Sequence, residues 1–176
     1  FYLHNLDYEN LLKKKIKTNS LNYVYLDQDF GTNYEFMDQN LKMYNEGKIW
    51  KNNQKLFDLI KKKYKKKTII ASHPSRKNKI KIKNSIFKKN KTFELISNAK
   101  VVFAYDSTAI QMAVVLNKPI ILLTHEYFRN DFRRSKYLKL FKQELDLNVV
   151  DLDRIDNLDF LKKIKINKKK YKSYLK

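Results

Sequence analysis

The residues best suited to chemistry lie in three short polar segments of this 176-residue chain. The segments are DQDFG (27–31), HPSR (73–76) and DST (106–108), and each follows an apolar, β-branched run. A helix start presents free N–H groups and a partial positive charge, so a helix opening at DST is suited to hold a phosphate. The imidazole of His73 can add a further donor. We therefore predict a phosphate site built from a helix end, hydroxyls and His73.

Each segment also has an ordinary structural interpretation. Ser107 and Thr108 can form a plain helix N-cap, and His73 can be a loop residue whose neighbouring proline ends a strand. Asp27 and Asp29 favour turns beside a glycine. Taken singly, these interpretations are the commoner ones. All three segments, however, directly follow predicted buried strands, and this co-occurrence favours a shared binding site.

Several kinds of site are excluded by what the chain lacks. It has two glycines and contains neither GxGxxG nor GxxxxGK[ST], which argues against a dinucleotide dehydrogenase or a P-loop NTPase. It has no cysteine, so disulfides, thiolate nucleophiles and cysteine-bound zinc are excluded. The three histidines, His4, His73 and His125, are far apart in sequence, and we predict no metal site and no cofactor.

Hydrophobic periodicity places these segments between strands and helices. We predict strands at 22–26, 68–72, 101–105, 119–123 and 148–152, and helices at 49–67, 93–99, 107–116, 127–145, 156–163 and 168–176. Thr92 is expected to cap the second helix, Asn117 to end the third in a left-handed conformation, and the lysine-rich residues 75–91 to form a loop.

The alternation of strands and helices defines the expected fold class. Most of the strands are continuous apolar runs, which is typical of a parallel sheet covered on both faces. We predict an α/β fold, Rossmann-like, with an open, mainly parallel sheet and helices on both faces. Ligands bind such sheets outside the carboxyl ends of the strands, where all three polar segments should lie.

Composition limits the partners and the extent of the protein. The chain carries a formal net charge of +21, which suggests anionic partners, although most of its lysines are expected to be solvated. It is 43% hydrophobic and long enough for one domain, so we treat residues 1–176 as a single domain. Because it begins at Phe1 rather than Met, we expect it to be a piece of a longer protein.

The order of the segments resembles the C-terminal, donor-nucleotide-binding half of GT-B glycosyltransferases. The resemblance rests on YVYLDQD, an amphipathic helix, IIASHPSR and KTFELISNAKVVFAYDSTAIQMAVVLNKPIILL, and it covers about residues 23–123. The likeness is closest to bacterial enzymes of surface carbohydrate biosynthesis, which build capsule polysaccharide and lipopolysaccharide. Bacterial sialyltransferases and polysialyltransferases are similar in outline.

The resemblance implies roles for particular residues. It implies that the donor nucleotide is bound by His73, Pro74, Arg76, Thr92, Ser107 and Thr108, and that Asp27 or Asp29 is the general base that accepts the proton of the acceptor hydroxyl. The chain departs from the sialyltransferase pattern by reading LDQDFG, so the base can instead belong to the missing N-terminal domain. Transfer is expected to be inverting and metal-independent, with a nucleotide-sugar donor as substrate.

The remaining expectations concern partners and place. The acceptor is expected to be a glycan or a lipid-linked glycan, and the chain alone is expected to be inactive, because GT-B sites lie between two domains. We expect a cytoplasmic protein, with residues 162–176 able to lie on an anionic membrane at the inner face of the plasma membrane. The alternatives are a basic nucleic-acid-binding α/β domain and a membrane module without catalysis. Arg129, Arg133 and Arg134 are expected to form a solvated helix face.

Overall fold

The structure, a computed structural model, describes residues 21–30, 45–77 and 80–175. Its centre is a six-stranded sheet whose strands are all parallel. The strands are β1 (Asn22–Leu26), β2 (Thr68–Ser72), β3 (Ser85–Lys89), β4 (Ala99–Ala104), β5 (Ile120–Thr124) and β6 (Asn148–Asp151), in the order β3-β2-β1-β4-β5-β6. Val24 of β1 lies between Ile69 of β2 and Val102 of β4. The predicted α/β class with an open parallel sheet is confirmed.

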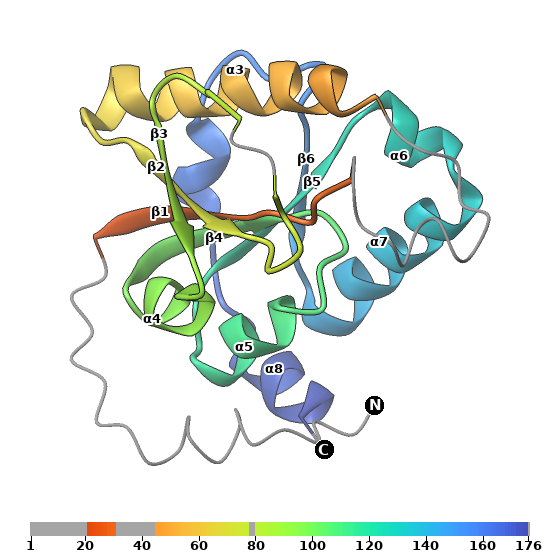
Figure 1. Ribbon diagram of the computed structural model, residues 1–176. Helices are drawn as coiled ribbons and strands as arrows, with labels where there is room; N and C mark the ends of the chain where they lie inside the picture. Colours follow the sequence, from red (N-terminus) through yellow and green to blue (C-terminus); the bar gives the residue numbers. More distant parts are fainter. Residues whose placement is uncertain (1–20, 31–44, 78–79, 176) are drawn as a thin grey trace.

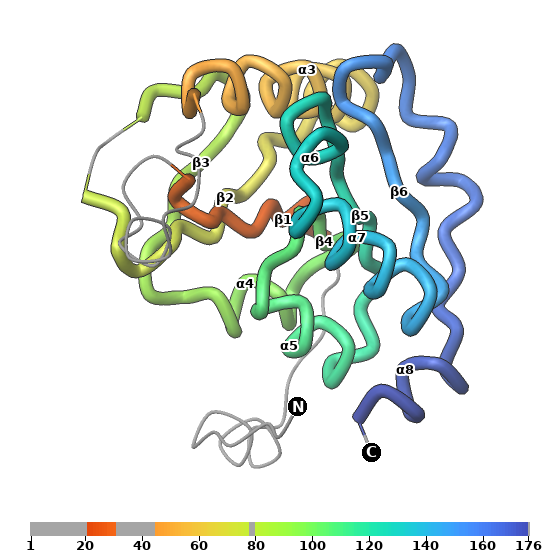
Figure 2. The backbone as a smooth tube through the Cα atoms, turned by 90° about the vertical axis from the view of Figure 1, so that its right-hand side faces the viewer, coloured from red at the N-terminus to blue at the C-terminus, as the bar shows by residue number. Residues whose placement is uncertain are grey.

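Helices cover both faces of this sheet. They are α3 (Glu46–Tyr64), α4 (Thr92–Ser97), α5 (Ile110–Val115), α6 (Glu126–Asn130), α7 (Phe132–Leu145) and α8 (Lys168–Tyr174), with a 3-10 helix η1 at Asp159–Lys163. Figure 1 shows α3 along one face and α4, α5 and α8 along the other. Figure 2, turned by 90°, shows the same three layers.

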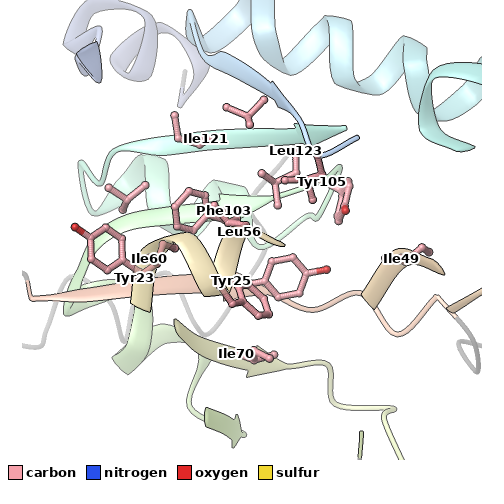
Figure 3. Packing of buried hydrophobic residues seen from close by; sticks show 14 of the residues in the cluster. Tyr23, Tyr25, Ile49, Leu56, Ile60, Ile70, Phe103, Tyr105, Ile121 and Leu123 are labelled. Atoms are coloured by element: carbon pink, nitrogen blue, oxygen red, sulfur yellow. The ribbon is translucent and has the colours of Figure 1, made fainter. Parts of the chain in front are cut away.

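Each face of the sheet has its own hydrophobic core. The core under α3 is rich in aromatic residues, and Figure 3 shows Tyr23 and Tyr25 of β1, Phe103 of β4 and Tyr105, just after β4, pointing into it. The rings of Tyr25 and Tyr105 meet edge to face, with centroids 6.3 Å apart. The opposite core is mainly aliphatic, although it includes the buried Tyr171. Successive residues of β1 therefore point into opposite cores, Tyr23 and Tyr25 into one and Val24 and Leu26 into the other.

Helix α3 illustrates why the sequence forms these elements where it does. The side chain of Asn45 accepts a hydrogen bond from the Lys48 amide at 3.1 Å, which caps the first turn. Basic residues occupy the last turn, where they complement the helix dipole. Leu56, Phe57 and Ile60 form the buried face, as the sequence pattern predicts, although the helix begins three residues earlier than expected.

One strand was missed by the sequence analysis. Residues 75–91 were predicted to be loop, but Ser85–Lys89 forms β3 and pairs along its length with β2. This prediction was wrong because β3 is an edge strand that contains two lysines and has no fully buried residue. Without a continuous apolar run, the usual signal of a parallel strand is absent.

Several predicted helices have different boundaries. The helix expected at 127–145 is divided into α6 and α7 by Asp131, which has extended backbone and caps α7 through the Arg134 amide. The helix expected at 156–163 is the 3-10 helix η1, and the final helix ends at Tyr174. Asn117 has a φ of 48°, so its predicted left-handed conformation is confirmed.

Candidate functional site

The polar segments meet at one edge of the sheet. Because all six strands are parallel, their carboxyl ends share that edge, and in Figure 1 the central strands β1 and β4 run from left to right towards it. The segment after β1 lies between the segments after β2 and β4, since β1 pairs with both strands. From β1 the next strands, β2 and β3, are added on one side of the sheet, whereas β5 and β6 are added beyond β4 on the other side. The strand order therefore reverses between β1 and β4, which form the topological switch point. Gly31 lies outside the described residues.

A buried ion cluster lies under the start of α3. We call Asp27, Asp29, Glu46 and Arg76 the Arg76 cluster. Arg76 makes a two-pronged contact with Asp27, in which Nη2 lies 2.9 Å from Oδ1, and the side chains are 3% and 1% exposed. Nη2 of Arg76 also lies 2.6 Å from a Glu46 oxygen and 3.3 Å from Asp29.

The charges in this cluster support one another. Burial alone lowers the pKa of Arg76, but the hydrogen bonds and negative charges of Asp27 and Glu46 raise it further than burial lowers it. The guanidinium therefore stays charged and is engaged by carboxylates. Two roles stay predictions: the binding of the donor nucleotide by Arg76, and the action of Asp27 or Asp29 as the general base.

His73 is tied to Asp29 through a residue that the sequence analysis did not single out. Nδ1 of His73 lies 2.7 Å from Oγ of Ser75, and that hydroxyl donates a hydrogen bond to Oδ2 of Asp29 at 2.9 Å. Asp29 is fully buried and has a positive φ of 50°, which aspartate tolerates better than most residues. The backbone N–H of His73 also donates to Asp27 at 3.2 Å.

Two groups of Ser75 contact Nδ1 of His73. The Ser75 amide donates to Nδ1 at 3.3 Å, which requires a lone pair on that nitrogen, whereas the 2.7 Å contact with the hydroxyl places a proton on Nδ1 when the hydroxyl gives its own proton to Asp29. The ring tautomer decides which of the two hydrogen bonds forms. Among the described residues, no group hydrogen-bonds to Nε2 of this half-buried histidine. That nitrogen is therefore the ring atom that a ligand can meet.

A second polar link joins β1, β4 and α7 across the switch point. Nε2 of Gln28 donates to Oδ1 of Asp106 at 2.9 Å, and Nη1 of Arg134 donates to Oδ2 at 2.6 Å. The Arg134 guanidinium also lies over the Phe30 and Phe128 rings. The expectation of a solvated face was therefore wrong for Arg134, which is 8% exposed. Arg134 lies 4 residues before Leu138 and 11 before Leu145, and this helical spacing puts it on the same face of α7 as these two buried leucines. The spacing could therefore have predicted that Arg134 points inward.

The DST segment is a turn rather than a helix start. Helix α5 begins at Ile110, so the predicted start at Ser107 was wrong. Ser107 is 8% exposed, and its hydroxyl accepts a hydrogen bond from the Ala109 amide at 3.3 Å. Bonds from Ile110 N to Ser107 O and from Gln111 N to Thr108 O tighten the turn. Thr108, in the same turn, is exposed.

Thr92 lies farther from the switch point, and Pro74 lies exposed beside His73. Thr92 is the first residue of α4 and not its cap, so the predicted N-cap was wrong; Lys91 occupies that position and makes no side-chain cap. Because α4 follows the edge strand β3, Thr92 is separated from β1 by β2. Pro74 is exposed in the turn after β2. The structure thus groups His73 with Asp27, Asp29 and Arg76, and sets Ser107 and Thr108 across β1 from them.

A pocket of about 480 Å³ adjoins the Arg76 cluster. The pocket is lined by the first half of α3 and by two isoleucines from the connection between β2 and β3. The lining residues are Glu46, Gly47, Trp50, Lys51, Gln54, Ile80 and Ile82. Glu46 belongs to both the pocket and the cluster. Neither His73 nor Ser107 lines this pocket, so the switch point and the pocket are separate features of the same end of the sheet.

Neither a cluster suited to a metal ion nor a helix able to cross a membrane occurs in the described residues. Within residues 21–30, 45–77 and 80–175, no group of three or more His, Cys, Asp or Glu side chains is arranged to hold a metal ion. None of the helices in those ranges combines the length and the apolar character needed to cross a bilayer. In comparisons with known proteins, no family model and no curated protein matches this chain.

Proposed function

We propose that this chain is the donor-nucleotide-binding domain of a glycosyltransferase that makes bacterial surface carbohydrate. One observation carries the proposal: His73 and Ser107 follow β2 and β4, the two neighbours of β1, at the same edge of the sheet. They therefore flank the switch point, which is where open parallel sheets bind nucleotides. The resemblance of the segment order to GT-B enzymes supplies the reaction class, which the fold alone does not specify.

In the proposed reaction, groups at this edge of the sheet stabilise the nucleotide phosphate as it leaves. Negative charge builds on that phosphate as the glycosidic bond to the donor breaks, and donors fixed in advance lower the barrier. In our proposal His73, oriented through Ser75, contacts the phosphate with Nε2 when the ring is protonated. The hydroxyl of Thr108 adds a second donor from the opposite side of β1.

Asp27 and Asp29 have a different part in this proposal from the one that the resemblance implies. Both carboxylates are buried and engaged by Arg76, and Asp29 also accepts from Ser75. We infer that they position Arg76 and His73. The general base that accepts the proton of the acceptor hydroxyl would then come from the second domain that a GT-B enzyme requires, and this chain alone would show no turnover.

Nucleotide binding tests the proposal directly. Thermal unfolding would be followed with CMP, UDP, GDP and CDP in turn, and one of them at a hundredfold excess over its dissociation constant should add about 2.7 kcal/mol to the free energy of unfolding. His73→Ala and Ser107→Ala should abolish that gain. Ser135→Ala, on α7, is the matched serine control and should retain it.

Two results would contradict the proposal. The first is the absence of stabilisation by any of the four nucleotides. The second is equal stabilisation of the wild type, His73→Ala and Ser107→Ala, which would place the nucleotide elsewhere. Tight, salt-sensitive RNA binding in place of nucleotide binding would favour the nucleic-acid alternative.

A further inference from the structure

The outward face of α7 exposes large apolar side chains to an unusual degree. Phe132, Tyr137 and Leu140 are 79%, 52% and 45% exposed. They account for half of the large hydrophobic side chains that are exposed in the described part of the chain, the others being Leu21, Ile86 and Leu175. Scattered exposed apolar residues are normal, whereas a group on one helix marks an interaction surface.

Cationic side chains lie among these apolar groups. Helix α7 contains five Lys and Arg residues and one acidic residue, Glu144. Arg134 points inward to Asp106, whereas Arg133, Lys136 and Lys139 are exposed. At a hundred degrees per residue, Phe132, Lys136, Arg133 and Leu140 fall on one side of the helix, opposite the buried Leu138 and Leu145. The helix therefore has two apolar sides, one in the core and one mixed with positive charge.

We propose that this face of α7 docks on an anionic lipid bilayer. Lysine is depleted from the cores of protein–protein interfaces, which makes a protein partner a poor match for a face with this composition. Nucleic acid would leave Phe132 and Leu140 without a suitable environment. An anionic membrane satisfies both groups at once, because the aromatic and aliphatic side chains enter the headgroup boundary while the cations meet lipid phosphates.

The geometry of α7 suits docking parallel to the membrane surface. Phe132 and Leu140 are eight residues apart, so they lie roughly 12 Å from each other along the helix axis. Tyr137, between them in sequence, adds an amphipathic ring of the kind enriched at membrane interfaces. The N-terminal turn of α7 also carries Arg134, which contacts Asp106 at the carboxyl edge of the sheet. Docking through α7 would therefore bring the switch point close to the bilayer, whatever reaction takes place there.

Vesicle co-sedimentation of the full chain tests this proposal. Wild-type protein should bind vesicles that contain phosphatidylglycerol, and should bind pure phosphatidylcholine vesicles more weakly. The variant Phe132→Ser/Tyr137→Ser/Leu140→Ser should bind the anionic vesicles more than about tenfold more weakly. The matched control, Leu21→Ser/Ile86→Ser/Leu175→Ser, removes three exposed apolar side chains elsewhere and should bind like the wild type.

Charge variants separate a specific face from the general basicity of the chain. Lys136→Gln/Lys139→Gln on α7 should weaken binding more than Lys62→Gln/Lys88→Gln, which removes the same charge from α3 and β3. If circular dichroism shows that the triple α7 variant is unfolded, the single variant Phe132→Ser replaces it in the vesicle assay. This variant should fold, since the side chain is 79% exposed, and it should bind anionic vesicles more weakly than the wild type.

Three outcomes would overturn the proposal. These are absence of binding to anionic vesicles, equal loss of binding in the α7 and control variants, and a change of oligomeric state in the α7 variant without vesicle binding. The last result would show that the face is a protein interface.

Discussion

Arg76 and Asp27 form a two-pronged ion pair that is almost completely removed from solvent, although 49 positions separate them in sequence. Asp27 follows β1 and Arg76 lies in the turn after β2, so the pair joins the ends of two adjacent strands. It also receives the backbone N–H of His73. The pair therefore holds the connection after β2 in place, and with it the ring that we expect to meet a ligand.

Breaking this pair should cost far more than breaking an exposed one. Arg76→Ala would leave two or three buried carboxylates without their partner, and loss of one member of a buried pair typically costs 3–5 kcal/mol. Arg129→Ala, which removes a partly exposed pair with Asp151 and Asp153, should cost about 1 kcal/mol or less. Urea unfolding measures both, and similar losses in the two variants would contradict this view of the cluster.

A second buried polar group should behave in the same way. The side chain of Asn53 donates to the Tyr25 hydroxyl and accepts from the Tyr105 hydroxyl, both at 3.0 Å, and all three residues are fully buried. Asn53→Ala should destabilise the protein by about 3 kcal/mol, because each unsatisfied hydroxyl costs about 1–3 kcal/mol. Asn130→Ala, at an exposed position of α6, is the control and should change stability by less than about 0.5 kcal/mol. An Asn53 variant as stable as this control would show that water replaces the amide.

The fold could be predicted from sequence where apolar runs were long and regular. Strand β1, strand β2 and the buried face of α3 follow from such runs, and their parallel arrangement follows from the alternation with helices. Strand β3 could not, because its pairing with β2 compensates for a sequence that lacks an apolar pattern. The break at Asp131 contains neither proline nor glycine, and it depends on a local cap.

The site could be predicted in outline only. That the segments after β1, β2 and β4 share an edge follows from strand direction, which the sequence pattern indicated. The contacts within that edge join residues that are distant in sequence: Ser75 meets Asp29 across 46 positions and Gln28 meets Asp106 across 78. Such pairs depend on how strands are ordered and how loops fold over them, and a single sequence shows neither.

His125 should make stability depend on pH in the mildly acidic range. It is 1% exposed, its Nδ1 accepts from the Tyr127 amide, and burial lowers its pKa from 6.5 to about 4 despite the nearby Asp153. The unfolded chain therefore binds a proton that the folded protein does not. Stability should be highest above pH 6.5 and should fall by up to about 3 kcal/mol as pH drops from 6.5 to 4.

The variant His125→Asn isolates this contribution. Asparagine can still accept a hydrogen bond from the Tyr127 amide, so the start of α6 stays capped while the titrating group is lost. The free energy of unfolding of the variant, measured from pH 7 to 4, should fall less steeply than that of the wild type. Parallel curves would mean that His125 has access to water in the folded protein.

The ring state of His73 can be read independently of any activity. If the Ser75 hydroxyl gives its proton to Asp29, the neutral ring carries its proton on Nδ1, and the 3.3 Å contact of the Ser75 amide with that nitrogen is not a hydrogen bond. Long-range ¹⁵N–¹H correlation spectra detect the position of the ring proton directly. Ser75→Ala removes the acceptor of that proton, and the Nε2-protonated form should then become prevalent. Ser97→Ala, a serine whose hydroxyl bonds only within α4, should leave the His73 spectrum unchanged. If the wild-type ring is already protonated on Nε2, the Ser75 hydroxyl must donate to the ring, and Asp29 no longer orients the residue on which the proposed phosphate site depends.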